Sequence, residues 1–286
     1  MRASRSGDGC GANWPLCNGQ AIPAAAAGTT PPKTLIEYAH RLTSALDGLL
    51  VAGLALWAFV RFPKGHRVRQ GAALSTIFIV TESLIGAGLV LLRLVGDNAS
   101  VARAVYLSIH LTNTFILIAV LALTAWWSGL EKASRMRLRD FLAGRTGAAI
   151  AAALAIGVSG AVAALGATLF PERVPAVNVS PLTPAAQLLF SLKHYNLHPL
   201  AALLAGGYLL HFARVSTTST GNRHDRWVRR WALLLALLVP AQWVAGLVNA
   251  AFFAPVGLQM IHLLLADLLW AALVLLAAAN NETKAL

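Results

Sequence analysis

The chain has 286 residues, of which 57% are hydrophobic and only 12% are charged. This balance is far too apolar for a soluble domain of this length and indicates a membrane protein. The net charge of +12 would also suit a nucleic-acid-binding protein, but the basic residues gather in alternate loops between apolar segments, which excludes that class.

Apolar segments follow one another along the chain, and each is long enough to cross the hydrocarbon core as a helix of about 20 residues. Helices are the expected structure, because lipid cannot satisfy unpaired backbone groups. We predict seven spans, at residues 36–60, 72–95, 104–127, 147–170, 195–213, 231–253 and 259–279. The expected fold class is therefore an all-α polytopic membrane protein.

The basic residues predict how these spans are oriented. Fourteen of the 23 lysines and arginines lie in three alternate loops, within 61–69, 132–145 and 214–230. Such loops face the cytoplasm by the positive-inside rule. We therefore expect a multi-pass protein of a bacterial plasma membrane, with its N-terminal segment outside and its C-terminus, residues 280–286, in the cytoplasm.

Both cysteines of the chain, Cys10 and Cys17, lie in the outer N-terminal segment. An oxidising outer compartment permits a disulfide there. A structural metal site would need about four ligands, and no histidine lies nearby. A disulfide or a redox-active dithiol is thus favoured over a metal site.

An internal repeat relates the two parts of the chain. At an offset of 158 residues, His40 aligns with His198, and the small and apolar residues that follow them also agree. At an offset of 152 residues, His110 aligns with His262. The alignment predicts two homologous helical units in the same orientation, which is a parallel repeat.

The helices between these histidines correspond as well. The sequence ESLIG aligns with QWVAG, so that Glu82 and Gly86 meet Gln242 and Gly246. Glu82 lies in the middle of its span, where a lipid-facing carboxylate would be costly, and must face the helix bundle. The sequence assigns it no task.

The two halves, residues 1–145 and 146–286, are nevertheless unequal. The second half opens with the span 147–170, for which we expect no counterpart in the first half, because the sequence starts only shortly before the cysteines. The position of Glu37 is held by Tyr195 in the second half. A duplicated scaffold with this ionisable difference predicts halves that share a ligand type but not a task.

Four of the eight histidines are related by the repeat: His40, His110, His198 and His262. Each falls within the first two turns of a predicted span that enters from outside, so we expect a shared layer about 5–10 Å below the outer surface. A single histidine there is often a packing partner, but polar groups at this depth are usually functional. Two imidazoles from facing helices can ligate one haem iron, whereas zinc or copper would need further ligands.

Three further charged residues lie near this layer. Glu37 is three residues before His40 on the same helical face, where it would act as a general base, stabilise a developing cation, or only favour a helix N-terminus. Arg41 and Arg103 would either pair with haem propionates or extend to the lipid headgroups.

The run CGANWPLCNG (10–19), followed by IEYAHRLTS (36–44), resembles the haem A synthase family, membrane enzymes that convert haem O to haem A for respiratory oxidases. The paired cysteines, the Glu-x-x-His at 37–40 and the later histidine-bearing helices extend this resemblance over essentially the whole chain. It implies a four-helix bundle repeated in tandem, in which the first helix of the first repeat is missing here.

The resemblance also implies separate tasks for the two histidine pairs. His40 and His110 would lie near the substrate haem O in the N-terminal half. His198 and His262 would hold a haem b cofactor in the C-terminal half.

The remaining matches concern the chemistry. Glu37 matches the family's essential carboxylate, and Cys10 and Cys17 match its outer cysteine pair. The implied reaction oxidises a porphyrin methyl group to a formyl group through successive hydroxylation. Besides the lipid bilayer, we expect haem O synthase, an electron-transfer protein and further copies of this chain as partners.

Two other protein classes fit parts of this pattern. A b-type cytochrome that only relays electrons would also need paired histidines, but it needs neither Glu37 nor the cysteine pair. A transporter built on a parallel repeat would place polar residues near the bilayer midplane, whereas these histidines cluster toward the outer edge.

Overall fold

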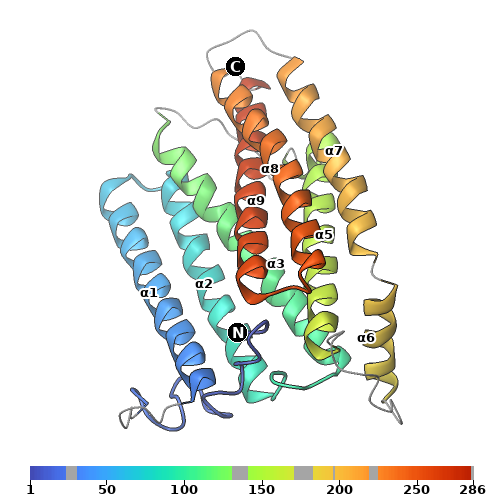
Figure 1. The fold of residues 1–286 in the computed structure, drawn as a ribbon. Helices are drawn as coiled ribbons and strands as arrows, with labels where there is room; N and C mark the ends of the chain where they lie inside the picture. The colour runs from blue at the N-terminus through green and yellow to red at the C-terminus, as the bar shows by residue number, and fades with distance from the viewer. Residues whose placement is uncertain (24–30, 131–140, 171–182, 196, 219–224, 285–286) are drawn as a thin grey trace. The chain divides into compact units, whose positions relative to one another are not determined.

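The computed structural model describes residues 1–23, 31–130, 141–170, 183–195, 197–218 and 225–284. These residues form eight helices and no strand, and seven of the helices are long and apolar enough to cross a membrane. The helices are α1 (Pro32–Arg61), α2 (Arg67–Leu91), α3 (Val101–Ser128), α5 (Gly144–Leu169), α6 (Pro184–His194), α7 (His198–Thr218), α8 (Asp225–Ala251) and α9 (Val256–Lys284) (Figure 1). The predicted all-α polytopic class is confirmed.

Each predicted span corresponds to one of the long helices, with ends that differ by a few residues. Helix α1 begins at Pro32, four residues before the predicted start, because proline suits the first turn of a helix. Helix α2 ends at Leu91 rather than at residue 95. Arg93 adopts a left-handed conformation (φ 55°), and the Leu94 N–H donates to the Leu89 carbonyl oxygen at 2.8 Å, which closes the helix.

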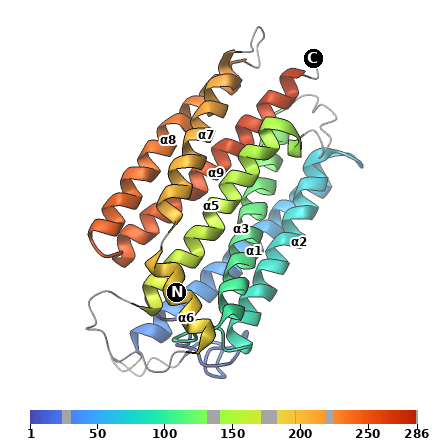
Figure 2. The ribbon, with the colours of Figure 1, turned by 90° about the vertical axis from the view of Figure 1, so that its right-hand side faces the viewer.

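Helix α6 was not predicted, because at 11 residues it is too short and too polar to register as a span. Pro184 occupies its first turn, and the Thr183 hydroxyl caps it by accepting from the Ala186 N–H at 3.3 Å. Lys193 then donates through Nζ to the carbonyl of Phe170, the residue that follows α5, at 2.6 Å. Figure 2 shows α6 beside the end of α5.

The described chain groups into two compact units. Unit 1 comprises Met1–Leu54, Thr76–Thr114 and Val158–Asn196, and unit 2 comprises Ala55–Ser75, Phe115–Gly157 and Leu197–Leu286. The predicted halves, 1–145 and 146–286, are defined by the sequence repeat, whereas these units are defined by compactness in space. The halves therefore remain a prediction.

In unit 2, helices α7, α8 and α9 lie side by side (Figure 1). Gly206 of α7 faces the indole of Trp243 on α8, whose Nε1–H donates to the Ala202 carbonyl at 3.0 Å. The α9 residues Trp270, Ala272, Leu273, Val274, Leu276, Ala277, Ala278 and Ala279 form much of the buried core of this unit.

Large apolar side chains remain exposed along the long helices. Leu49 is 71% exposed and Val60 is 80% exposed on α1, and Leu247 is 70% exposed on α8. Such surfaces would be costly in water and are expected of helices that face lipid.

Candidate functional site

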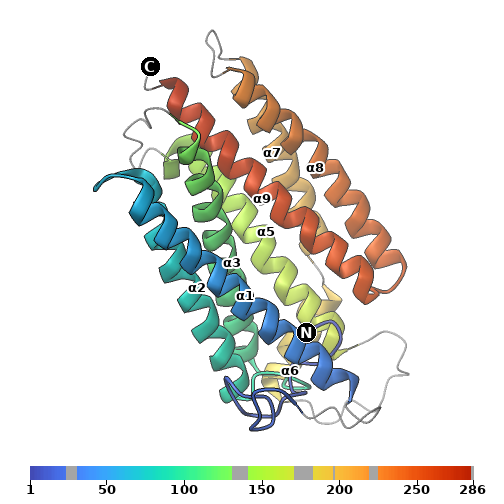
Figure 3. The same ribbon diagram turned by 90° about the vertical axis from the view of Figure 1, so that its left-hand side faces the viewer.

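The N-terminal segment is closed by a disulfide between Cys10 and Cys17, both of which are buried. Two backbone hydrogen bonds support the same loop: Asn18 N–H to the Cys10 carbonyl at 3.0 Å, and Cys17 N–H to the Gln20 carbonyl at 2.9 Å. Figure 3 shows this segment beside the start of α1. Of the two states left open by the sequence, the structure has the disulfide.

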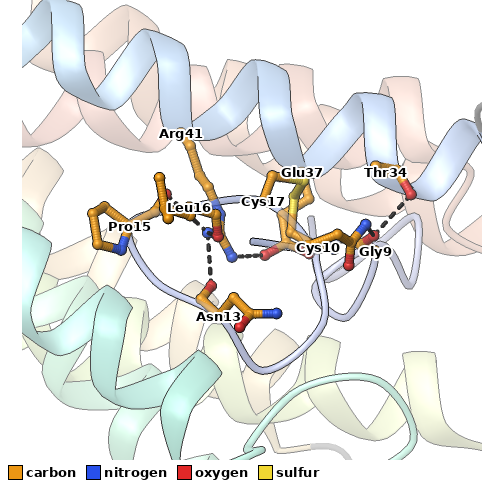
Figure 4. Close-up of a disulfide and its surroundings, with 10 residues drawn as sticks. Gly9, Cys10, Asn13, Pro15, Leu16, Cys17, Thr34, Glu37 and Arg41 are labelled. Atoms are coloured by element: carbon orange, nitrogen blue, oxygen red, sulfur yellow. Dashed lines mark hydrogen bonds and ion pairs between the residues drawn. A yellow bond between two sulfur atoms is a disulfide. The ribbon is translucent and has the colours of Figure 1, made fainter. Parts of the chain in front are cut away.

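Glu37 of α1 binds this loop through its carboxylate. Its side chain is fully buried, and its Oε2 accepts from the Cys10 N–H at 2.8 Å (Figure 4). Its Oε1 accepts from Nη2 of Arg41, one turn further along the helix, at 2.5 Å. The predicted carboxylate is therefore dry, charge-paired and held against the disulfide loop.

Arg41 also holds the disulfide loop against α1. Its Nη1 donates to the carbonyls of Asn13 and Leu16, both at 2.8 Å, and of Pro15 at 3.2 Å (Figure 4). The guanidinium thus organises the loop, and its predicted contact with a haem propionate stays a prediction.

Arg103, the other arginine predicted to bind propionates, is also buried. Its Nη1 donates to the carbonyls of Gly96 at 2.7 Å and Asn98 at 2.9 Å in the loop between α2 and α3. Its Nε has no hydrogen-bond partner among the described residues. The propionate role of this residue likewise stays a prediction.

The first pair of histidines lies in unit 1. His40 and His110 are close enough to interact electrostatically. They are the ninth residue of α1 and the tenth of α3, so they lie in the third turn of each helix. The predicted position within two turns is wrong for this pair, because both helices begin three or four residues before the predicted spans.

Glu82 of α2 was given no task by the sequence, yet it contacts a predicted ligand. Its Oε1 lies 3.2 Å from Nδ1 of His110, a close polar contact rather than an aligned hydrogen bond. Asn113 donates to its Oε2 at 2.7 Å, and the Thr114 hydroxyl donates to its Oε1. The signal that could have found this contact is the repeat, which sets Glu82 against Gln242.

The second pair of histidines lies in unit 2. His198 opens α7, and His262 is the seventh residue of α9, so the prediction of the first two turns is right for both. They too interact electrostatically. Nε2 of Gln242 lies 3.5 Å from Nε2 of His262. Tyr195, the counterpart of Glu37, is 72% exposed.

A glycine lies beside the α3 and α9 histidines of these pairs. A Cβ added at Gly86 would lie 3.9 Å from Cε1 of His110, and one added at Gly246 would lie 3.2 Å from Cε1 of His262. Nδ1 of His262 is buried with no hydrogen-bond partner among the described residues. In unit 2, one ring nitrogen of His262 is thus left for a ligand.

These features fit haem better than other metal centres. Haem iron takes two axial imidazoles, and each histidine pair provides two. Within the part of the chain that the structure describes, no group of three or more His, Cys, Asp or Glu side chains is placed to hold a bare metal ion. A zinc or copper site would require such a group.

The fold and the site together define a polytopic α-helical membrane protein with two repeat-related histidine pairs, only the first of which lies near a buried carboxylate on the preceding turn. The chain belongs to the cytochrome oxidase assembly protein family, whose model matches residues 1–274.

Named relatives agree with this membership. The chain is 45% identical over 293 residues to a protoheme IX farnesyltransferase of Thermus thermophilus, in an alignment that covers 100% of the chain and 46% of the relative. It is 36% identical over 140 residues to a heme A synthase of an Exiguobacterium species (49% of the chain, 44% of the relative). It is 43% identical over 88 residues to a heme A synthase of Halalkalibacterium halodurans (30% and 28%). Each alignment thus covers less than half of the relative's length, and for the Thermus thermophilus protein this is the span of the whole chain.

Proposed function

We propose that this chain is a haem A synthase, which oxidises a methyl group of haem O to the formyl group of haem A by successive hydroxylation, for the assembly of respiratory oxidases. The observation that carries the proposal is the asymmetry of the repeat: there are two histidine pairs, and the turn before the first histidine carries the buried carboxylate Glu37 in one half and the exposed Tyr195 in the other. Membership of the family and the relatives named heme A synthase support it.

In the N-terminal half, His40 and His110 would hold the substrate. Conversion of a methyl to a formyl group removes four electrons and adds one oxygen atom, so positive charge develops at the reacting carbon. Glu37 would stabilise that charge or activate a water molecule. Its burial favours either role, because charges interact more strongly where water is excluded.

In the C-terminal half, His198 and His262 would hold a haem b. A haem b bound there supplies one-electron redox chemistry. Gly246 leaves room for the His262 ring to turn toward its ligand, since its missing Cβ would lie 3.2 Å from the ring. The exposed Tyr195 at the place of Glu37 supports a holding role for this half rather than a reacting one.

The partners follow from the proposed substrate. The relative from Thermus thermophilus is about twice as long as this chain and is named for farnesylation of protohaem. That reaction supplies the farnesylated haem that this chain would consume, which supports haem O synthase as a partner. The proposal also includes two further partners, an electron acceptor and other copies of the chain. It places the N-terminal segment outside the cell, because the basic loops alternate along the chain.

Separate substitution of the two pairs tests the division of tasks. His198→Ala and His262→Ala should each remove tightly bound haem b, because each removes one of the two imidazoles that would hold it. His40→Ala and His110→Ala should retain haem b and lose turnover. Absorption spectra and extracted haem of the purified full chain provide the measurement. Loss of haem b from His40→Ala but not from His198→Ala would show that the halves are assigned the wrong way round.

A further inference from the structure

We infer that Glu82 is a positioning residue for His110: it engages Nδ1, leaves Nε2 to face the iron, and makes this imidazole a stronger electron donor than its counterpart His262. The inference rests on the proposed function in one respect, that His110 ligates a haem iron.

The carboxylate of Glu82 is held in place by helix α3. Asn113 and Thr114 lie three and four residues after His110, on the same face of α3, and both donate to Glu82. The second N–H of Asn113 donates to the Phe78 carbonyl at 2.9 Å, and its Oδ1 accepts from the Thr81 hydroxyl at 2.7 Å. The amide is therefore locked, and Oε1 of Glu82 is kept within 3.2 Å of the imidazole.

A carboxylate at this place has a known physical effect on a ligating histidine. The partner of one ring nitrogen sets which nitrogen carries the proton and which is free to bind metal. A carboxylate partner also raises the basicity of the ligand. A more basic axial imidazole stabilises the oxidised iron, so its haem is harder to reduce.

The second half shows that helix packing does not require this group. Gln242 stands at the place of Glu82, and at the offset of the histidines Leu265 and Ala266 replace Asn113 and Thr114. The contact of Gln242 with His262 is looser, at 3.5 Å between nitrogens. An ionisable group inside the membrane is costly, so a carboxylate and two polar supports that lie beside His110, and are replaced by Gln242, Leu265 and Ala266 at His262, indicate a function there.

The consequence is a difference in midpoint potential between the two haem sites. The His110 side becomes the more easily oxidised one, which is the direction required if electrons are to leave the substrate. The swap of Glu82 and Gln242 across the repeat isolates this effect, because each substitution conserves side-chain size.

The experiment is an optical redox titration of the full chain purified with its haems, on Glu82→Gln, Gln242→Glu and the control Ser83→Ala. His110→Ala first identifies which spectral component belongs to the His110 side. Ser83 is exposed on the neighbouring position of α2 and donates to the Ile79 carbonyl of its own helix, so Ser83→Ala should change neither potential.

Glu82→Gln should raise the midpoint potential of the His110 component and weaken its haem affinity about 10- to 100-fold, with the other component unchanged. Gln242→Glu should lower the potential of the His262 component. An unchanged His110 potential in Glu82→Gln would overturn the inference. If Glu82→Gln binds no haem at all, Gln242→Glu becomes the test. An unchanged midpoint potential of its His262 component would then overturn the inference. A His110→Ala variant that keeps both components would instead overturn the proposed ligand, whatever Glu82 does.

Discussion

Glu37 uses one carboxylate for two purposes. One oxygen receives the Cys10 N–H and the other receives Arg41, so the group anchors the disulfide loop and also carries the charge proposed for catalysis. Removal of one partner of a buried ion pair costs about 3–5 kcal/mol, which alone could disturb the loop. A test of the charge therefore needs a control that loosens the loop and leaves the carboxylate intact.

Thr34 provides that control, because its hydroxyl donates to the Gly9 carbonyl at 2.7 Å one turn before Glu37. Glu37→Gln should retain the haem b spectrum and lower haem A formation about a hundredfold or more, with haem O accumulating. Thr34→Val should lose about 1 kcal/mol of stability and keep most of the activity. Extracted haems measured by chromatography decide the outcome. Equal losses of haem A in both variants would reduce Glu37 to a loop anchor.

The sequence singles out candidate residues here, but it does not predict their contacts. The four histidines stand out because the repeat aligns them in pairs. Glu37 stands out because the repeat sets it against Tyr195, which is not a carboxylate. The contacts of Arg41 with three loop carbonyls depend on how the disulfide loop folds, and no sequence periodicity carries that information. The contact of Glu82 with His110 depends on the rotation of α2 against α3, which hydrophobicity alone does not set.

At the scale of helices, the packing of α7 on α8 depends on one of two adjacent glycines. A Cβ added at Gly206 would lie 2.7 Å from Cζ2 of Trp243, so the two helices approach only because that Cβ is missing. At Gly207 an added Cβ would meet nothing within 4 Å. Helix α7 begins with His198, so this contact also helps to place a proposed haem ligand.

The pair of substitutions should have opposite effects. Gly206→Ala should destabilise the protein by about 1–3 kcal/mol through overpacking and loosen haem b. Gly207→Ala should be neutral or stabilise it by up to about 1 kcal/mol, because alanine is the better helix former. Thermal unfolding of the purified protein, followed by haem b absorbance, measures both. A stability change of the same sign and size in the two variants would contradict the packing described for α7.

Apolarity predicts the existence of the long helices but not their ends. The predicted spans follow the lipid-facing stretch, whereas the helices continue into polar residues that still satisfy their backbone, as α9 does through Asn280 and Asn281. Helix α6 depends on a threonine cap and a proline in the first turn rather than on apolar length, so a search for spans overlooks it.

For the whole molecule, the proposed function depends on a duplicated scaffold whose halves have diverged. Both halves carry a histidine pair and a glycine against one imidazole, while the first half alone adds Glu37, Glu82 and the disulfide. Glu37 and the disulfide would be superfluous in a protein that only relays electrons. This divergence supports the proposal that the chain changes a bound haem chemically.

The most direct test is haem A formation by the chain itself. The full chain would be expressed in cells that make haem O but have no haem A synthase of their own, with His110→Ala as the inactive control, and the extracted haems would be separated and weighed by mass spectrometry. We expect haem A with the unaltered chain and only haem O and haem b with the control. A purified chain that carries haem b, receives haem O and yields no haem A would contradict it.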